Sequence, residues 1–436
     1  SSISLISASA TAGAVTLASN KTINGAGGSI LIQSDTLAIS GAGQKIQSTD
    51  GTLQIMPYTA TTTIGIDGGA GTWTLPTTTY WSNAGNQVFQ DGFKLITVGS
   101  ASNSGLITVG ASGTTFTFFS PLTVQNSGSI NLAGTTVAPV NGDKLNISLS
   151  SAAVDMATGV TAPVVLNGGG GNISIISNTS LTPATGTYST TYDRIYSAGG
   201  TLTLAPYTLT NTIGVGVAGM TLNISSAILD GTDSIFGNGG KFVGFVFGTN
   251  NQTGLTSLSG TITTGTTNPA SITFAGPVSL VAATTINTSN KAITFNGTLN
   301  GAFGLTTNSG VGNTSFNGVV GGTTALTSLN ITAGAMNLGG GVTTSGNQTW
   351  NASITLTGNT NLVVNTASTG SITFGSLANI DVLSYGLLIQ ADNLTFNSGA
   401  QIASSTHLGT LQIQPFTASR TVGINTTSCA NSATAI

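Results

Sequence analysis

A short phrase recurs along the second half of the chain, and its spacing restricts the possible folds more than any other feature. The clearest copies are Ile272–Gly276, Ile293–Gly297 and Thr314–Gly318, each with β-forming residues before a Phe and a Gly two residues after it. Weaker copies follow, and the central residues of all copies, spaced by about 20 residues, are Phe274, Phe295, Phe316, Leu338, Leu356, Phe374 and Phe396. Such a period with strand-like alternation is typical of a repeat protein built of β-strands. We predict an all-β fold, a parallel β-helix (β-solenoid) with roughly 20 residues per coil, in which these residues form one inward-pointing column.

The low charge of the chain agrees with stacked coils. Charged residues make up 4% of the 436 residues, and the formal net charge is −3. Equivalent side chains in a parallel solenoid lie about 4.8 Å apart, and at that separation two like charges repel by about 0.9 kcal/mol even in water. Thr, Ser and Asn stack without this repulsion, and Asn forms hydrogen-bonded ladders. Disorder is the competing interpretation, but it requires low hydrophobicity and high net charge, and the mean hydropathy is +0.32.

A longer phrase, Gly-Thr-Leu-x-(Ile/Leu)-x-Pro-(Tyr/Phe)-Thr, occurs three times and closes each time with Thr-(Ile/Val)-Gly-(Ile/Val). Pro cannot donate a ladder hydrogen bond, so each Pro predicts a corner, and we expect the following aromatic residue to cover it. The corner residues are Pro57, Tyr58, Pro206, Tyr207, Pro415 and Phe416. An aromatic strip that binds a ligand is the alternative interpretation. Asp35 and Asp392 hold the same place in the segments before the first and third copies, which favours a structural turn role for both.

No charge run or Pro-rich linker marks a domain boundary. We therefore expect residues 1–436 to form a single continuous β-solenoid of roughly 20 coils. Residues 111–170 and 230–260 fit the period less well, and we expect less regular excursions there. Trp73, Tyr80 and Trp81 cluster near another such place and are candidate ligand contacts.

The Pro phrase resembles one found in large filamentous-haemagglutinin-like exoproteins and autotransporter passengers of Gram-negative bacteria. The segment Phe316–Leu329, followed by Val342–Trp350, is similar to the same proteins, and together these phrases cover about two thirds of the chain. The resemblance implies a right-handed parallel β-helix, export across the outer membrane with two-partner secretion as one route, and a role in adhesion, biofilm or surface fibres. We find neither the terminal secretion domain nor the membrane domain of that family, and neither an initiator Met nor a signal peptide. We therefore expect a processed chain or a repeat fragment.

Residues suited to catalysis or metal binding are sparse. Carboxylate catalysis needs acids that converge on a groove, and the Asp residues here are scattered. The one close pair, Asp230 and Asp233, lacks further acidic ligands for calcium, which favours a solvated turn. His407 and Cys429 are the only His and Cys, so neither a Cys/His metal cluster nor an internal disulfide is expected. We predict no enzymatic activity, no cofactor and no metal.

Several binding functions are also disfavoured. The chain has no uninterrupted apolar run long enough for a transmembrane helix. Its nearly uncharged surface offers no electrostatic basis for binding nucleic acid. Ice binding by Thr needs a flat ladder of Thr-x-Thr pairs, and the Thr pairs in this sequence are irregular.

The sequence favours a structural protein at the cell surface or outside the cell. We expect a β-solenoid that associates with further copies of itself, end to end, into a surface fibre or matrix filament. Neither end shows a polar or helical cap, and an uncapped coil exposes strand edges to which another chain can add. The alternative is a monomeric, rod-like adhesin that binds glycans or a host surface through loops near Trp73–Trp81 or residues 230–250. A polysaccharide-active enzyme is the third class considered.

Overall fold

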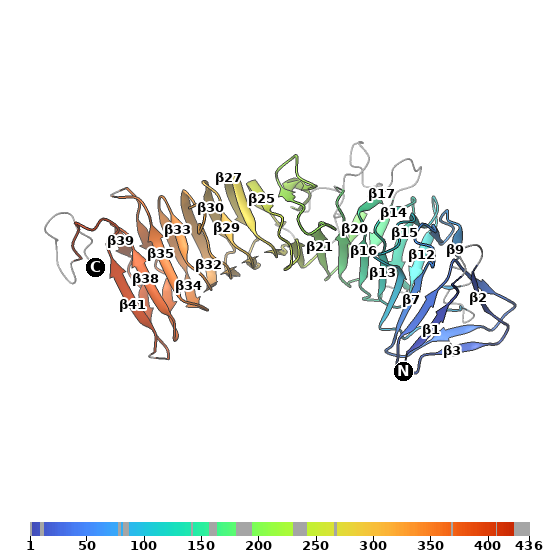
Figure 1. The fold of residues 1–436 in the computed structure, drawn as a ribbon. Helices are drawn as coiled ribbons and strands as arrows, with labels where there is room; N and C mark the ends of the chain where they lie inside the picture. The colour runs from blue at the N-terminus through green and yellow to red at the C-terminus, as the bar shows by residue number, and fades with distance from the viewer. Residues whose placement is uncertain are drawn as a thin grey trace. The chain divides into compact units, whose positions relative to one another are not determined.

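The protein forms parallel stacked coils with almost no helix (Figure 1). The computed structural model describes residues 2–8, 13–76, 80–81, 87–140, 143–156, 164–179, 194–229, 242–265, 268–367, 369–406 and 408–422. The predicted β-solenoid is confirmed, with about 15 turns and a spacing of about 24 residues. The coils are thus fewer and longer than the sequence period suggested.

The chain divides into two compact units. Unit 1 comprises Ser1–Thr208 and Gly231–Val243, and unit 2 comprises Leu209–Asp230 and Gly244–Ile436. Each unit has its own stack of coils and its own buried core. The single continuous body expected over residues 1–436 stays a prediction.

Unit 1 contains three main parallel ladders, and from β10 to β19 the chain visits them in turn. The first is β1 (Ile3–Ile6), β4 (Ile30–Gln33), β7 (Thr52–Met56), β10 (Leu95–Gly99), β13 (Leu122–Gln125), β16 (Ile147–Ser150), β19 (Ile173–Ile176) and β21 (Thr201–Ala205). The second is β9 (Trp73–Leu75), β8 (Ile64–Ile66), β11 (Ile107–Val109), β14 (Ser129–Leu132) and β17 (Ala153–Met156). The third is β12 (Thr115–Phe118), β15 (Thr136–Pro139), β18 (Val165–Asn167) and β20 (Arg194–Tyr196). Near the start, β2 (Ala14–Leu17) pairs with β5 (Thr36–Ile39), and β3 (Thr22–Asn24) pairs with β6 (Lys45–Gln47).

Coil length varies in unit 1, which hides its regularity in the sequence. Partners along the first ladder are unequally spaced in the chain, and the step from Leu53 to Ile96 is by far the longest. That long step contains an insertion with β9 and several aromatic residues. Residues 111–170, for which we expected a less regular course, contribute β12 to β18 to in-register ladders. Corners of unequal length between matched strands therefore produced the apparent irregularity.

Unit 2 also builds three ladders, and its long strands cross from one ladder to the next. The Phe ladder is β24 (Gly244–Phe247), β26 (Ser271–Phe274), β28 (Ile293–Phe295), β31 (Asn313–Phe316), β32 (Ser328–Leu338), β34 (Gln348–Leu356), β37 (Asn379–Asp381) and β40 (Gln401–Ala403). The Thr ladder is β25 (Thr256–Thr263), β27 (Val278–Asn287), β30 (Gly304–Asn308), β32, β34, β36 (Ile372–Phe374) and β39 (Leu394–Phe396).

The third ladder of unit 2 ends at the last described strand of the chain. It contains β33 (Val342–Thr344), β35 (Thr360–Val364), β38 (Gly386–Gln390) and β41 (Thr410–Gln414). Single bridges through Val320 connect β33 to β29 (Leu299–Asn300), which pairs with β27. Early in the unit, β22 (Ile213–Val215) pairs with β25 and with β23 (Leu222–Ile224), and the 3-10 helix Ser226–Leu229 follows.

Stacked aromatic rings form the core of the Phe ladder. Phe247, Phe274, Phe295 and Phe316 are in register, with ring centroids 5.8, 5.0 and 5.2 Å apart along the column. All four are at most 1% exposed, and Leu338 and Leu356 continue the column. Aromatic contacts at these distances add to the stabilisation from burial.

Phe374 and Phe396 lie in a different column from the one predicted. They stack on each other at 4.9 Å and are in register with Trp350 of the Thr ladder. The phrase that ends in Phe occurs on both the Phe ladder and the Thr ladder. Two copies of the same phrase therefore need not occupy the same position in the coil. From Leu356 to Phe374 the chain reaches only the neighbouring ladder, whereas from Trp350 to Phe374 it completes a coil.

Two tight excursions follow the closing part of the Pro phrase. In each, a strand pairs in parallel with the strand just before it: β9 with β8 and β23 with β22. The loop crosses directly over the central Gly of the first strand. A Cβ at Gly65 would lie 1.9 Å from the Gly69 carbonyl oxygen, and one at Gly214 would lie 2.4 Å from that of Val217. The Gly of this motif is therefore required by the close approach of the backbone.

Replacing Phe295 with Ala should destabilise unit 2 by about 3–5 kcal/mol, because it leaves a cavity between two stacked rings. Chemical denaturation followed by circular dichroism measures the change. Val311→Ala is the matched control, since Val311 is 81% exposed and its replacement should cost less than about 0.5 kcal/mol. Equal effects of the two substitutions would contradict a packed aromatic column.

Candidate functional site

A carboxylate fastens the first Pro corner to the preceding coil. Asp35 accepts hydrogen bonds from the Thr59 backbone N–H (2.8 Å), the Thr59 hydroxyl (2.6 Å) and the Thr62 hydroxyl (3.0 Å). Burial acts to raise the pKa of Asp35, but the hydrogen bonds from Thr59 and Thr62 outweigh it and hold that pKa below its usual value. The side chain is thus occupied in joining two coils, whereas the sequence favoured a structural role within a turn.

The other two copies of the corner contain the same hydrogen-bonded link between coils, which we call the clamp. Asp392 accepts from the Thr417 N–H at 2.8 Å and from the Thr417 hydroxyl at 2.5 Å, and the Nε of Arg420 lies 3.5 Å from the same carboxylate. In the second copy Asn178 accepts from the Thr208 N–H at 2.9 Å and donates its amide to the Thr208 hydroxyl at 2.9 Å. Asn178 was missed in the sequence because the segment around it differs from the other two. Its distance to the Thr of the corner also differs, with 30 residues from Asn178 to Thr208 against 24 from Asp35 to Thr59 and 25 from Asp392 to Thr417.

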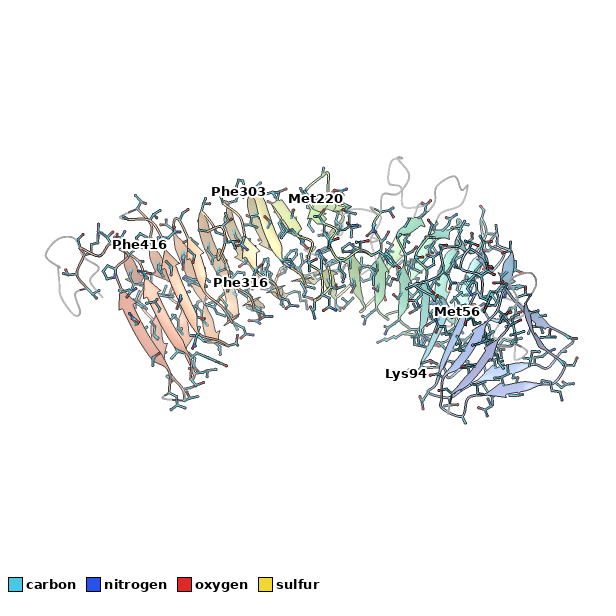
Figure 2. All side chains as sticks on the ribbon, viewed as in Figure 1. Met56, Lys94, Met220, Phe303, Phe316 and Phe416 are labelled. Carbon is cyan, nitrogen blue, oxygen red and sulfur yellow. The ribbon has the colours of Figure 1, made fainter. Side chains whose placement is uncertain are left out.

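The Pro residues, more than the aromatic residues, fill these corners. Pro57 and Pro206 are buried, while Pro415 is half-buried. Tyr58 is 38% exposed, and Tyr207 and Phe416 are half-buried, so each aromatic ring covers its corner only in part. Figure 2 shows Phe416 near the end of unit 2 that carries β41. The three corners are built alike, but no described contact joins their rings into a continuous strip.

The aromatic residues predicted to be ligand contacts are part of the core of unit 1. Trp73, Tyr80 and Trp81 are 1%, 4% and 0% exposed. The Tyr80 hydroxyl donates to the Leu37 carbonyl at 2.8 Å, and burial raises the pKa of Tyr80 to about 12. These side chains therefore offer no surface to a glycan. Aromatic residues in an insertion look alike in sequence whether the insertion folds inward or outward.

Trp81 is the centre of this buried cluster. Its ring meets Phe89 edge-on at a centroid distance of 5.0 Å and Phe116 at 5.2 Å. Edge-to-face pairs at these distances stabilise a core. The cluster packs the long insertion between β7 and β10 against the third ladder of unit 1.

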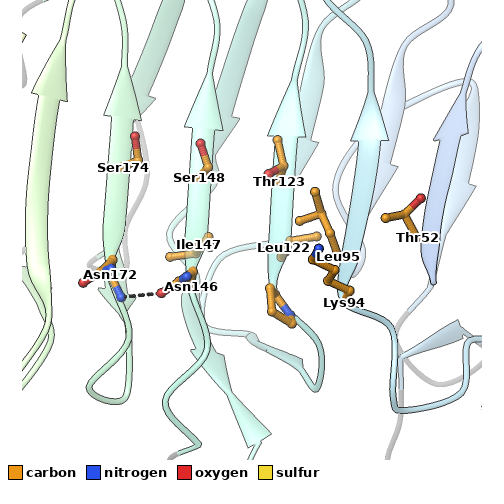
Figure 3. A pocket seen from close by; sticks show the side chains of 11 residues that line it. Thr52, Lys94, Leu95, Leu122, Thr123, Asn146, Ile147, Ser148, Asn172 and Ser174 are labelled. Carbon is orange, nitrogen blue, oxygen red and sulfur yellow. Dashed lines mark hydrogen bonds between the residues drawn. The ribbon is translucent and has the colours of Figure 1, made fainter. Parts of the chain in front are cut away.

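The outer face of the first ladder of unit 1 has an open depression (Figure 3). Thr123, Ser148 and Ser174 lie side by side on successive strands, and Lys94 is the one charged side chain in the lining. At one edge the Asn172 backbone N–H donates to the Asn146 side-chain oxygen at 2.8 Å. The lining has hydrogen-bonding groups but no acid–base pair suited to catalysis.

Apolar residues of the last ladder of unit 2 are uncovered. Leu53, Leu202 and Leu411 hold the same place in the three copies of the Pro phrase, yet their exposures are 0%, 0% and 48%. In the first copy, β7 lies between β4 and β10. The strand of the third copy, β41, pairs with β38 on one side, and no strand of the described chain pairs with its other side.

The described residues contain no group of three or more His, Cys, Asp or Glu side chains that could hold a metal ion. None of their helices has the length and apolar character needed to cross a membrane. Asp230, Asp233, His407 and Cys429 lie outside the described residues.

Comparison with known proteins gave no match to a family model, a curated protein or a solved structure. The interpretation of function therefore depends on the geometry of the chain itself.

Replacing Asp35 with Ala should lower the free energy of unfolding of unit 1 by about 2 kcal/mol at neutral pH, because the Thr59 N–H loses its acceptor. Asp35→Asn should cost less, since Asn178 already serves the equivalent corner. Chemical denaturation of the three proteins measures the difference. Equal losses for Ala and Asn would contradict a hydrogen-bonded clamp.

The same clamp predicts a pH dependence. Because the folded-state pKa of Asp35 is below its unfolded value, its stabilisation is present above about pH 4 and is lost as the pH falls through the folded pKa. The wild-type protein should therefore lose more stability between neutral pH and acid than Asp35→Asn does. Parallel stability curves for the two proteins would show that the carboxylate contributes nothing.

Proposed function

We propose that the protein is an extracellular structural β-solenoid that associates end to end with further copies of itself into a surface fibre or matrix filament. The observation that carries the proposal is the outer edge of β41. This strand has the sequence pattern of β7, which is paired on both sides, but its own outer side has no described partner. A strand supplied by a second copy would complete the same arrangement.

The chemistry of this edge favours addition of a strand. Unpaired N–H and C=O groups at the edge of a sheet template pairing with another chain. Leu411 is 48% exposed at this edge. Fully burying a Leu side chain contributes about 1.5–3 kcal/mol. Strand β1 of unit 1 offers a matching surface, because its inward-facing Ile3 and Leu5 are only half-buried, whereas the side chains that they pair with on β4 are buried.

The low charge of the chain also supports axial association. With a formal net charge of −3 on 436 residues, copies of the chain repel one another little. Stacked Thr, Ser and Asn columns continue across a joint without facing like charges. The alternative of a monomeric adhesin loses one of its two candidate binding regions, because Trp73, Tyr80 and Trp81 are buried. In the other region, residues 230–241 lie outside the described part of the chain.

Substituting Leu411 with Lys should raise the concentration needed for assembly at least about tenfold, because a charge replaces an apolar contact at the joint. Leu377→Lys is the control, since Leu377 is 57% exposed and lies in the corner between β36 and β37, outside the edge strand β41. Sedimentation velocity and electron microscopy of the full chain measure assembly.

Two outcomes would overturn the proposal that the chain forms a fibre. The first is a wild-type chain that stays monomeric at high concentration, as expected if the edge of β41 is covered by further coils of a longer polypeptide. The second is an equal effect of Leu377→Lys, which would indicate a general effect of added charge.

A further inference from the structure

The outer face of the Thr ladder of unit 2 carries a regular array of hydroxyl and amide groups. One outward column runs through seven successive coils, each residue in register with the next: Thr261, Thr285, Thr306, Asn330, Thr349, Thr373 and Thr395. A second outward column lies two residues further along five of these strands: Thr263, Asn287, Asn308, Thr332 and Asn351. We call these two columns the Thr face.

The residues between the two columns anchor the face to the core. They are Ile262, Ile286, Thr307, Ile331 and Trp350, and each is 0% exposed. With the intervening side chain held inside, the residues on either side must point outward. Their outward direction therefore follows from the alternation of the strand.

The face is a two-dimensional lattice. Neighbouring strands are about 4.8 Å apart and alternate residues along a strand about 6.7 Å apart. The ladder contains two register shifts, between Leu258 and Gly260 and between Thr332 and Ala335. Both lie outside the segments that form the face, so the lattice is unbroken across it.

The chemistry of the Thr face is uniform and uncharged. In the described part of unit 2 the charged side chains are Lys291, Asp381, Asp392 and Arg420, and none belongs to either column. The β-branched Thr side chain has few accessible rotamers, and stacking restricts it further. The hydroxyl and methyl groups are thus positioned before any ligand arrives, which reduces the entropy lost on binding.

These properties match a ligand that is itself a lattice of hydrogen-bonding groups. Sites for single small molecules are concave and lined with aromatic side chains, but the largest aromatic ring of this ladder, Trp350, points inward. Nucleic acids and acidic glycans require cationic groups, which the two columns lack. Ordered water at an ice surface offers donors and acceptors at repeated intervals and no charge.

We propose that the Thr face binds ice, with its hydroxyl and amide groups joining an ordered layer of water and its methyl groups fitting between the water molecules. The sequence argued against this function because its Thr pairs are irregular. On the face, one row is the Thr pair Thr261 and Thr263, and each of the other four rows combines one Thr with one Asn. The rows nevertheless remain in register, so hydroxyl and amide groups form the regular array that the order of residues does not show. This inference does not depend on the fibre proposed above.

The test compares Thr306→Leu, at the middle of the face, with Thr294→Leu on the Phe ladder. Thr294 is an equally half-buried, outward Thr in a stacked column. Its column differs from the Thr face because it also contains the buried Ser315 and the charged Asp381. Uptake of the full chain into slowly growing ice and inhibition of ice recrystallisation are measured, and circular dichroism checks that each variant is folded.

The wild-type chain is expected to concentrate in the ice, and Thr306→Leu to reduce recrystallisation inhibition about tenfold, since a bulkier apolar group disrupts the match at the centre. Thr294→Leu should leave it unchanged. Exclusion of the wild-type chain from ice would overturn the proposal. So would an equal loss of inhibition in both folded variants.

Discussion

Parallel stacking in register is the constraint on which both units depend. Each strand hydrogen-bonds to the equivalent strand of the coil before and after it, so every side chain faces a counterpart about 4.8 Å away. Inside, this contact is favourable for rings, as in Phe274, Phe295 and Phe316. Outside, it disfavours repeated charge and favours Thr, Ser and Asn. The apolar core and the uncharged surface therefore have one cause.

The Asp residues next to the Pro corners follow from the same constraint on stacked charge. Asp35 and Asp392 do not repeat on adjacent coils, and each carboxylate is held by hydrogen bonds from the Thr of the next Pro corner. Asn178 makes the equivalent contacts without a charge. The clamp joins two coils at the position where Pro interrupts the ladder, so it replaces a lost backbone interaction with a side-chain interaction.

Variation in the corners explains most differences between sequence and structure. Strands keep their register while the connecting segments change length, so the period in the sequence varies from coil to coil and is longest between Leu53 and Ile96. The column of Phe274 was predictable because its first steps are nearly equal. The assignment of Phe374 and Phe396 was not, because the same phrase occurs on two ladders. The Thr face was obscured by the corners, since irregular counts in the chain become a regular lattice in space.

The sequence alone determined the fold class, the absence of stacked charge, the inward direction of Phe274, Phe295 and Phe316, and a structural role for Asp35 and Asp392. These features are local or depend on nearly equal spacing, and both are visible in the order of residues. Only the tertiary structure decided that Trp73, Tyr80 and Trp81 are buried, that Leu411 is exposed where Leu53 is not, and which Thr residues share a face. These three features depend on which coil lies above and below each residue. The lengths of the corners set that arrangement, and the sequence pattern does not constrain those lengths.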